Sequence, residues 1–257
     1  MSETGDATAL LGSMFGLAGK VALLTGGSVG MGRAAGLAMA AAGARVILAD
    51  DAVRVATLSD LPAGVEAVSL DVTDEAAVDA LLADIVARHG GLDILVNGAV
   101  LNHNRNLLEI SGDEWDRVQA VNLKSAFLAS RAAIPAMRTR GGGRIINLST
   151  MGSVHPVLNG NAAYSSSRAG LNQLTRNIAL DFAADHITAN AILPGAIITE
   201  TVKSGFVPTG PGADLARHLG GFGRPDDVTG LILLLAGPSG RFISGQSIAV
   251  DGGFLVS

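Results

Sequence analysis

Short runs of apolar residues alternate along this chain with longer stretches in which apolar positions recur every three or four residues. The short runs predict buried strands and the longer stretches predict helices. Strands are expected at 21–24, 45–48, 65–70, 92–96, 144–148, 188–193 and 247–250. Helices are expected at 33–42, 74–89, 115–137, 162–184 and 227–236. Such alternation predicts a parallel sheet with helices on both faces, a doubly wound α/β fold.

The length and composition favour one large packed domain. The chain has 257 residues, of which 48% are hydrophobic and 16% charged. A chain of this length and composition can bury a substantial core without splitting into separate units. We expect a single domain over 14–257, preceded by a flexible extension at 1–13.

Several classes of protein are disfavoured by what the sequence lacks. It has no cysteine, its net charge is -5, and no His/Asp/Glu cluster has the spacing of metal ligands. No apolar run approaches the ~18 residues of a membrane span. The first 19 residues hold no Lys or Arg, which argues against a secretory signal. We therefore expect a cytoplasmic protein with no metal, no membrane and no nucleic-acid partner.

A glycine-rich stretch stands where the first strand turns into the first helix of the domain. Glycine allows positive φ angles and lets a ligand reach the backbone, and the helix N-terminus favours a pyrophosphate. Asp50 ends the next strand, 20 residues after Gly30, where the ribose hydroxyls of a dinucleotide would lie. The alternative is an ordinary tight turn. The candidate cofactor residues of the stretch are Thr25, Gly26, Ser28, Val29, Gly30, Met31 and Gly32.

The spacing Thr-Gly-x-x-x-Gly-x-Gly resembles the short-chain dehydrogenase/reductase family, and the resemblance extends from about residue 15 to the end. It implies a Rossmann fold with a single seven-stranded parallel sheet. It also implies a nicotinamide-dependent oxidoreductase that interconverts a secondary alcohol and a ketone. Asp50 predicts NAD rather than NADP, because a carboxylate accepts from ribose hydroxyls and repels a 2′-phosphate.

Further cofactor contacts are implied by the resemblance. Asp71 and Val72 would hold the adenine ring, although Asp71 could equally serve as an acidic residue before a helix. Asn97 and Ala99 belong to a segment that would pass the adenosine ribose. After the sixth strand, the segment that would hold the carboxamide contains Pro194, Gly195, Ile197 and Thr199.

The candidate active site lies at Tyr164-Ser-Ser-Ser-Arg168, which resembles the family's Tyr-x-x-x-Lys motif. Positions four apart share one face of a helix, so the phenol and the guanidinium can face one cleft. The resemblance assigns Tyr164 as general acid/base. Arg168 stands where the family has lysine. It can bind ribose and supply a fixed charge, but it cannot exchange its proton as lysine does.

Two more members of the catalytic set are implied by motif position. Thr150 occupies the place of the family's serine, 14 residues before Tyr164, and Ser149 and Ser153 remain alternatives. Asn122 matches the family's asparagine, whose use is to open a helix so that a backbone carbonyl binds water. The alternative is a helix-surface asparagine.

The substrate is expected to be an uncharged, mostly apolar secondary alcohol or its ketone. Ser153, His155 and Phe206 are the candidate substrate contacts, and His155 could equally be a surface residue. The resemblance of residues 245–253 to the family's last strand implies a homotetramer. Two other functions stay open: a 3-oxoacyl-thioester ketoreductase, and a weakly active or non-catalytic NAD-binding protein.

Overall fold

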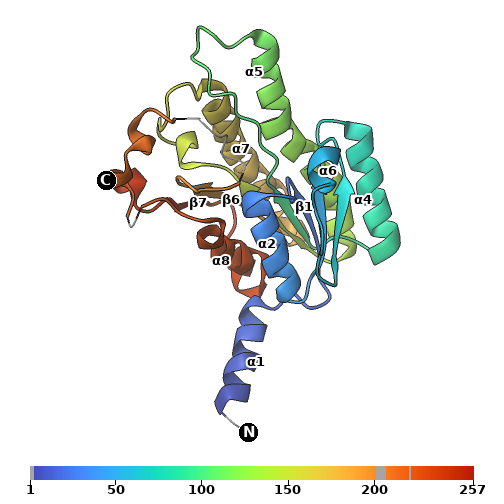
Figure 1. Ribbon diagram of the computed structural model, residues 1–257. Helices are drawn as coiled ribbons and strands as arrows, with labels where there is room; N and C mark the ends of the chain where they lie inside the picture. The colour runs from blue at the N-terminus through green and yellow to red at the C-terminus, as the bar shows by residue number, and fades with distance from the viewer. Residues whose placement is uncertain (1–2, 201–206, 220) are drawn as a thin grey trace.

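The predicted α/β fold is confirmed by the computed structural model, which describes residues 3–200, 207–219 and 221–257 (Figure 1). Its sheet has seven parallel strands in the order β3-β2-β1-β4-β5-β6-β7. The strands are β1 (Val21–Thr25), β2 (Arg45–Asp50), β3 (Val65–Ser69), β4 (Ile94–Asn97), β5 (Gly143–Leu148), β6 (Ile187–Pro194) and β7 (Ser247–Val250).

Eight α-helices connect and cover the strands. They are α1 (Glu3–Phe15), α2 (Gly30–Ala41), α3 (Ala52–Val55), α4 (Glu75–His89), α5 (Gly112–Gln119), α6 (Ser125–Thr139), α7 (Ala162–Asp181) and α8 (Pro225–Ala236), counted over the described residues. Most of the sequence-based boundaries differ by one to three residues, and two differences bear on the site. α2 begins at Gly30 rather than at residue 33, and the expected helix at 115–137 is divided by a π-helical segment, Ala120–Lys124.

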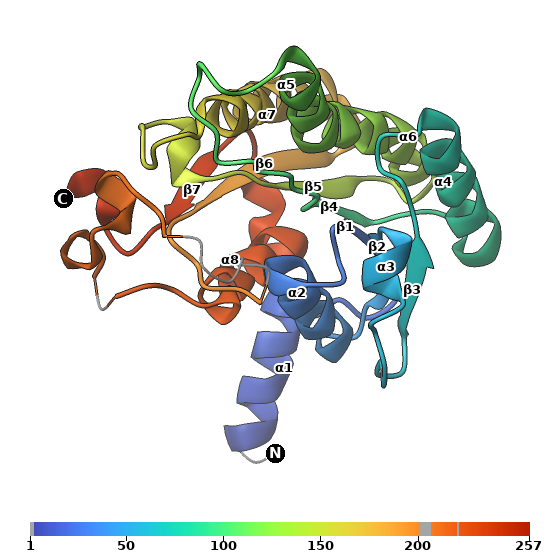
Figure 2. The ribbon, with the colours of Figure 1, turned by 45° about the horizontal axis from the view of Figure 1, so that its top comes forward.

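The helices form a layer on each face of the sheet, with α4, α6 and α7 on one side and α2 and α8 on the other (Figure 2). Successive side chains of a strand point to opposite faces. Accordingly, Leu23 packs in the core cluster that includes α4 and α6, whereas Leu24 packs with α2 and α8. Because both faces are covered, β1 is buried along its whole length.

Local signals explain where several helices begin. The Asp74 carboxylate accepts a hydrogen bond from the Ala77 N–H at 3.2 Å and caps α4. Ser111 and Glu114 form a reciprocal capping box at the start of α5. These side chains satisfy N–H groups that the first turn of a helix leaves without partners.

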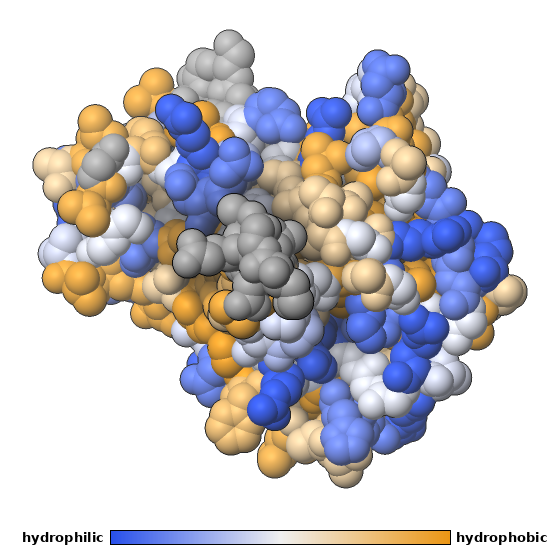
Figure 3. Space-filling model, turned by 90° about the horizontal axis from the view of Figure 1, so that it is seen from below, coloured by the Kyte–Doolittle hydropathy of each residue, from blue (hydrophilic) through white to orange (hydrophobic). Residues whose placement is uncertain are grey.

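The N-terminal extension contains helix α1, which projects from the body (Figure 1). Its Leu10 and Leu11 side chains are exposed. Figure 3 shows the molecule from below relative to Figure 1, the end from which α1 projects, and hydrophilic and hydrophobic residues are interspersed on this face. Across the residues that the structure describes, every helix is too short or too polar to cross a lipid bilayer.

The order of the strands creates a crevice at their carboxyl ends. The chain runs outward from β1 to β2 and β3, and then returns to place β4 on the other side of β1. In open α/β sheets a ligand binds at such a reversal, outside the carboxyl ends of the strands. Thr25 and Asn97, the last residues of β1 and β4, lie level with each other there.

We predict that Gly32→Ala lowers the free energy of unfolding by about 1–3 kcal/mol, since overpacking costs this much. A Cβ at position 32 would overlap the Gly26 carbonyl oxygen and lie 3.1 Å from Gly27 Cα. The measurement is urea denaturation.

The matched control is Gly230→Ala in the interior of α8, where a Cβ would meet nothing within 4 Å. It should stabilise the protein by up to ~1 kcal/mol through helix propensity. Equal effects of the two substitutions would contradict the close packing at Gly32.

Candidate functional site

The glycine loop crosses closely under the loop that follows β4. Gly26 has a φ of 66°, and a Cβ there would lie 2.7 Å from Ala99 N and from Gly98 C and O. Gly98 N–H donates to the Thr25 carbonyl oxygen at 3.0 Å. Only glycine fits at position 26, because both its φ and this contact exclude a side chain. The candidate residues Thr25, Gly26 and Ala99 are thus brought together.

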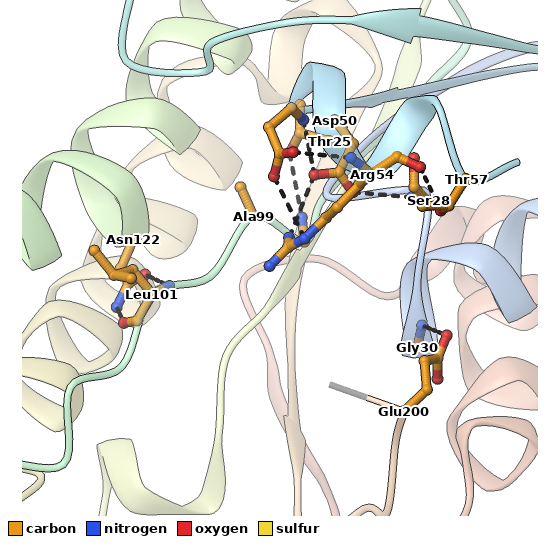
Figure 4. A network of polar contacts seen from close by, with 12 residues as sticks. Thr25, Ser28, Gly30, Asp50, Arg54, Thr57, Ala99, Leu101, Asn122 and Glu200 are labelled. Carbon is orange, nitrogen blue, oxygen red and sulfur yellow. Dashed lines mark hydrogen bonds and ion pairs between the residues drawn. The ribbon is translucent and has the colours of Figure 1, made fainter. Parts of the chain in front are cut away.

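Asp50 lies beside the glycine loop at the end of β2 and is 5% exposed. Its Oδ2 accepts from Ser28 N–H at 3.0 Å, and its Oδ1 accepts from Asp51 N–H at 2.9 Å and from Arg54 Nη1 at 3.3 Å (Figure 4). An ionised carboxylate has about four acceptor positions. These three donors therefore leave Asp50 capacity for one more donor.

Gly30, the first residue of α2, donates its N–H to the Glu200 Oε1 at 2.8 Å (Figure 4). This bond lowers the pKa of the Glu200 carboxyl, with help from its own N–H and from the charge of Arg33, while partial burial opposes the shift. A carboxylate thus occupies an N–H of the helix end that the sequence assigns to a pyrophosphate. No motif in the sequence identified Glu200.

Asp71 and Asn97 use their side chains within the protein. Asp71 Oδ1 accepts from the Thr73 hydroxyl at 2.7 Å and the Thr73 N–H at 2.9 Å, and these bonds lower the Asp71 pKa. Asn97 Nδ2 donates to Asn147 Oδ1 at 2.8 Å inside the sheet. Val72, next to Asp71, packs against the core. A ligand would therefore meet the backbone of Asn97 rather than its amide.

Asn122 lies in the π-helical segment and is 1% exposed, so it is not a helix-surface asparagine. Its side chain accepts from Leu101 N–H at 2.7 Å and donates to the Leu101 carbonyl at 2.9 Å (Figure 4). It also donates to Ser167 Oγ at 3.1 Å. The amide thereby ties the loop after β4 to both α7 and the π segment. Leu101 and Ser167 were not identified from the sequence.

Arg168 is a buried cation, 2% exposed, on the same helix as Tyr164. Its Nη2 donates to the Ala99 carbonyl at 2.9 Å and its Nη1 to the Asn122 carbonyl at 3.3 Å. Its Cζ lies 5.7 Å from the centre of the Tyr164 ring. Burial lowers the pKa of Arg168, while Tyr164 partly opposes that shift. Within the described part of the chain, no carboxylate forms an ion pair with it.

Three hydroxyl groups follow β5, and their hydrogen bonds differ. Ser149 Oγ donates to the Arg168 carbonyl at 3.3 Å. Ser153 Oγ donates to the Thr150 carbonyl at 2.5 Å and accepts from Asn172 Nδ2 at 2.8 Å. Thr150 Oγ1 accepts from Gly152 N–H at 3.1 Å, a bond that leaves its own proton available.

This hydroxyl loop packs on the start of α7. A Cβ at Gly152 would lie 3.4 Å from Ser165 Oγ, in the first turn of that helix. Tyr164 precedes Ser165 and is partly exposed. The structure therefore brings Thr150, Ser153 and Tyr164 to one region at the carboxyl end of β5.

The segment after β6 lies against the glycine loop. A Cβ at Gly195 would lie 2.6 Å from Asp251 Cα, and Ile197 forms a parallel bridge with Gly223. Thr199 Cγ2 would be 3.2 Å from a Cβ at Gly30. Thr199 therefore lies at the glycine loop, whereas Gly195 and Ile197 contact Asp251 and Gly223.

A cavity of about 360 Å³ lies beside the hydroxyl loop and contains the exposed His155. Its lining residues are Val154, His155, Arg217, Phe254, Leu255 and Ser257. Arg217 donates to the Ser257 carbonyl at 2.9 Å and stacks over the Phe254 ring at 4.6 Å. Phe206, the remaining candidate substrate contact, lies outside the described residues.

The residues around the glycine loop fit a dinucleotide. Gly26 allows close approach of a ligand, Asp50 keeps acceptor capacity, and Ser28 Oγ is buried with no hydrogen-bond partner among the described residues. Gly30 presents a helix N-terminal N–H. Together they offer an anion site and an acceptor for hydroxyl groups.

Comparison with known proteins identifies the family to which this chain is similar. The model of a family described as enoyl-(acyl carrier protein) reductase matches residues 26–255. A probable short-chain type dehydrogenase/reductase from Bradyrhizobium diazoefficiens is 36% identical over 251 residues, which cover 92% of this chain and 88% of that protein. A 3-oxoacyl-[acyl-carrier-protein] reductase from Thermotoga maritima is 32% identical, with coverage of 93% and 99%.

A solved structure agrees with the sequence matches. That of a putative gluconate dehydrogenase from Agrobacterium tumefaciens superposes with a TM-score of 0.85 at 33% identity, covering 95% of this chain and 99% of the other. The chain therefore belongs to the short-chain dehydrogenase/reductase family, whose members are oxidoreductases that act on CH–OH groups of small molecules with a nicotinamide cofactor.

Proposed function

We propose that this protein is an NAD-dependent dehydrogenase that interconverts a secondary alcohol and a ketone, with Tyr164 as general acid/base. The observation that carries the proposal is the buried Arg168 guanidinium, which lies beside the Tyr164 ring with no carboxylate partner among the residues that the structure describes. A buried charge is costly unless it is compensated. A phenolate at Tyr164 supplies that compensation in the state that accepts the proton of the alcohol.

Arg168 stands, in this proposal, in the place of the family's lysine. Its guanidinium is committed to the Ala99 and Asn122 carbonyls. It therefore fixes the loop after β4 and supplies a charge, while the proton taken up by Tyr164 leaves by another route. An arginine keeps its proton at every ordinary pH.

Thr150 is the proposed hydroxyl that orients the substrate oxygen. Ser149 and Ser153 each donate their hydroxyl proton to a backbone carbonyl. Thr150 Oγ1 receives the Gly152 N–H instead, so its proton can be donated to the substrate. In this arrangement, Tyr164 takes the alcohol proton while Thr150 stabilises the developing ketone oxygen.

NAD is the proposed cofactor, and when bound it accepts the hydride from the alcohol carbon. Asp50 supports this choice, because its remaining acceptor capacity suits a ribose hydroxyl and its charge disfavours a 2′-phosphate. The nearby Arg54 offsets part of that charge at 3.3 Å. Gly26, Gly30 and Ser28 would surround the pyrophosphate, and Thr199 and Ile197 the nicotinamide end.

The substrate is proposed to be an uncharged, mostly apolar alcohol. Val154, Phe254 and Leu255 contribute apolar surface to the cavity beside the hydroxyl loop. Its one arginine, Arg217, is already engaged with Ser257 and Phe254, which leaves it poorly placed to recruit an acidic substrate.

A 3-oxoacyl-thioester ketoreductase is the second candidate, favoured by the similarity to the Thermotoga maritima protein. Turnover of thioesters alone, with none of simple alcohols, would select it. A homotetramer is also proposed, on the resemblance of residues 245–253 to the family's last strand, and a cytoplasmic location is proposed from the sequence alone.

Removal of single hydroxyl groups tests the catalytic assignment. With NAD and a panel of secondary alcohols, followed by NADH absorbance, Tyr164→Phe should lower kcat by roughly 10²–10⁴-fold, the usual contribution of general acid–base catalysis. The Kd for NAD, measured separately, should stay the same. Thr150→Val should also lower kcat.

Ser153→Ala is the matched control for Thr150→Val, since it removes a neighbouring hydroxyl whose proton is already donated within the loop. It should retain most of the turnover. An active Tyr164→Phe variant, or a Ser153→Ala loss larger than that of Thr150→Val, would refute the corresponding assignment.

Arg168→Lys should raise turnover and leave the Kd for NAD unchanged, because an ammonium is a compact donor that exchanges its protons. Arg168→Met, which removes the charge, should instead lose most of the activity. Steady-state kinetics and NAD titration of both variants check this. Turnover of Arg168→Lys below that of the native protein would mean that the guanidinium is adapted to this site.

Asp50→Asn should shift the ratio of NADP to NAD affinity toward NADP by about tenfold or more, since hydrogen bonds to a charged group contribute about 1.5–3 kcal/mol. The measurement is fluorescence titration with each cofactor. Asp51→Asn removes the same charge one residue away and keeps a good helix N-cap, so it serves as the control. Equal affinities of the native protein for NAD and NADP would exclude the proposed preference.

A further inference from the structure

Helix α2 begins without an N-cap of its own. Val29 precedes it with an extended backbone and offers no side-chain hydrogen bond, and no acidic residue lies in its first turn. A helix N-terminus with free N–H groups carries a partial positive charge. Among the residues that the structure describes, no side chain adjacent in the sequence therefore accepts a hydrogen bond from the first N–H groups of α2.

Glu200 supplies such an acceptor from the segment that follows β6. Its Oε1 accepts the Gly30 N–H at 2.8 Å, although the two residues are 170 positions apart (Figure 4). The positive charge of Arg33 also lowers the pKa of this carboxyl group. An anion of the protein itself is thus bound where a dinucleotide-binding fold places a phosphate.

Two further polar groups, in the glycine loop and the first turn of α2, have no hydrogen-bond partner among the described residues. Ser28 is 1% exposed, and its Oγ has no hydrogen-bond partner within the described residues. Arg33 Nε is likewise buried and unpaired in the same part of the structure. Such groups are costly to leave unsatisfied. The Glu200 carboxylate therefore satisfies this region only in part.

We propose that Glu200 is an internal competitor of the cofactor, a carboxylate that occupies the phosphate-binding N–H of Gly30 until a dinucleotide displaces it. The proposal rests on the dinucleotide site proposed above. One N–H cannot hold both anions at full strength, and two anions side by side repel each other. Entry of the pyrophosphate thus requires release of the carboxylate.

Release of Glu200 would also reach the nicotinamide end of the site. Thr199 precedes Glu200, and its methyl group lies against Gly30. When the carboxylate leaves, the hydrogen bond between Glu200 and Gly30 is lost. Cofactor binding and the position of residues 198–200 are therefore linked through the Glu200–Gly30 contact.

Binding of three ligands tests the proposal: NAD, ADP, which keeps the pyrophosphate, and adenosine, which has no phosphate. Isothermal titration should show that Glu200→Gln and Glu200→Ala bind NAD and ADP roughly two- to tenfold more tightly than the native protein, the size of a charge contact at a helix end. Their affinity for adenosine should be unchanged. Hydrogen exchange of the ligand-free proteins should show a less protected Gly30 amide in Glu200→Ala.

Two matched variants separate the contact from the overall charge. Glu109→Gln removes one exposed carboxylate elsewhere and should leave every Kd unchanged. Glu200→Asp keeps the charge but shortens the side chain by one C–C bond of about 1.5 Å. It should therefore bind ADP more tightly than the native protein, as Glu200→Gln does.

The outcomes are distinct. If Glu200→Asp behaves as native while Glu200→Gln tightens ADP binding, only long-range charge is at work and the proposal is overturned. Unchanged Kd values and an unchanged Gly30 exchange rate in every Glu200 variant overturn it as well. Absence of NAD and ADP binding in all proteins, the native one included, would instead refute the dinucleotide site itself.

Discussion

The buried guanidinium of Arg168 is the constraint on which the polar centre of this protein depends. A guanidinium that is 2% exposed needs hydrogen-bond acceptors inside the fold, and it donates to the Ala99 and Asn122 carbonyls. These bonds hold together the loop after β4, the π segment and α7. Asn122 joins the same three elements through Leu101 and Ser167. The guanidinium beside the Tyr164 ring is thus held by main-chain acceptors.

The other half of the crevice depends on contacts made by the backbone of the glycine loop. Gly26 lies against the 98–99 peptide, and Ser28 N–H holds Asp50 at the end of β2. Because these contacts involve main-chain atoms, they fix the glycine loop before any ligand arrives, and a rigid loop loses little entropy on binding. Two charged side chains border this loop: Arg54, which donates to Asp50, and Glu200, which accepts from Gly30.

The fold was predictable because hydrophobic periodicity and the glycine motif are local signals that agree with each other. Strand positions such as Leu23 and Leu24 follow directly from burial on both faces.

For the candidate site, the sequence indicated candidate residues but not their hydrogen bonds. Whether Thr150, Ser149 or Ser153 keeps a free proton depends on carbonyls and amides brought in by folding, including Asn172. Glu200 had no sequence signal, since its partner Gly30 lies 170 residues away. Helix α1 was not predicted, because its apolar residues Leu10 and Leu11 are exposed and so do not mark a face that packs on the core.

The π segment between α5 and α6 has a consequence for how the fold can change. Each residue of an α-helix turns the chain by about 100°, and a π turn accommodates one extra residue. The faces of α5 and α6 are therefore out of phase by that rotation, which directs Leu128 and Met137 of α6 into the core. The same extra residue gives Asn122 its place and leaves its carbonyl to Arg168. The same inserted residue therefore sets both the packing of α6 and the position of Asn122, so deleting one residue here would alter the core and the polar centre together.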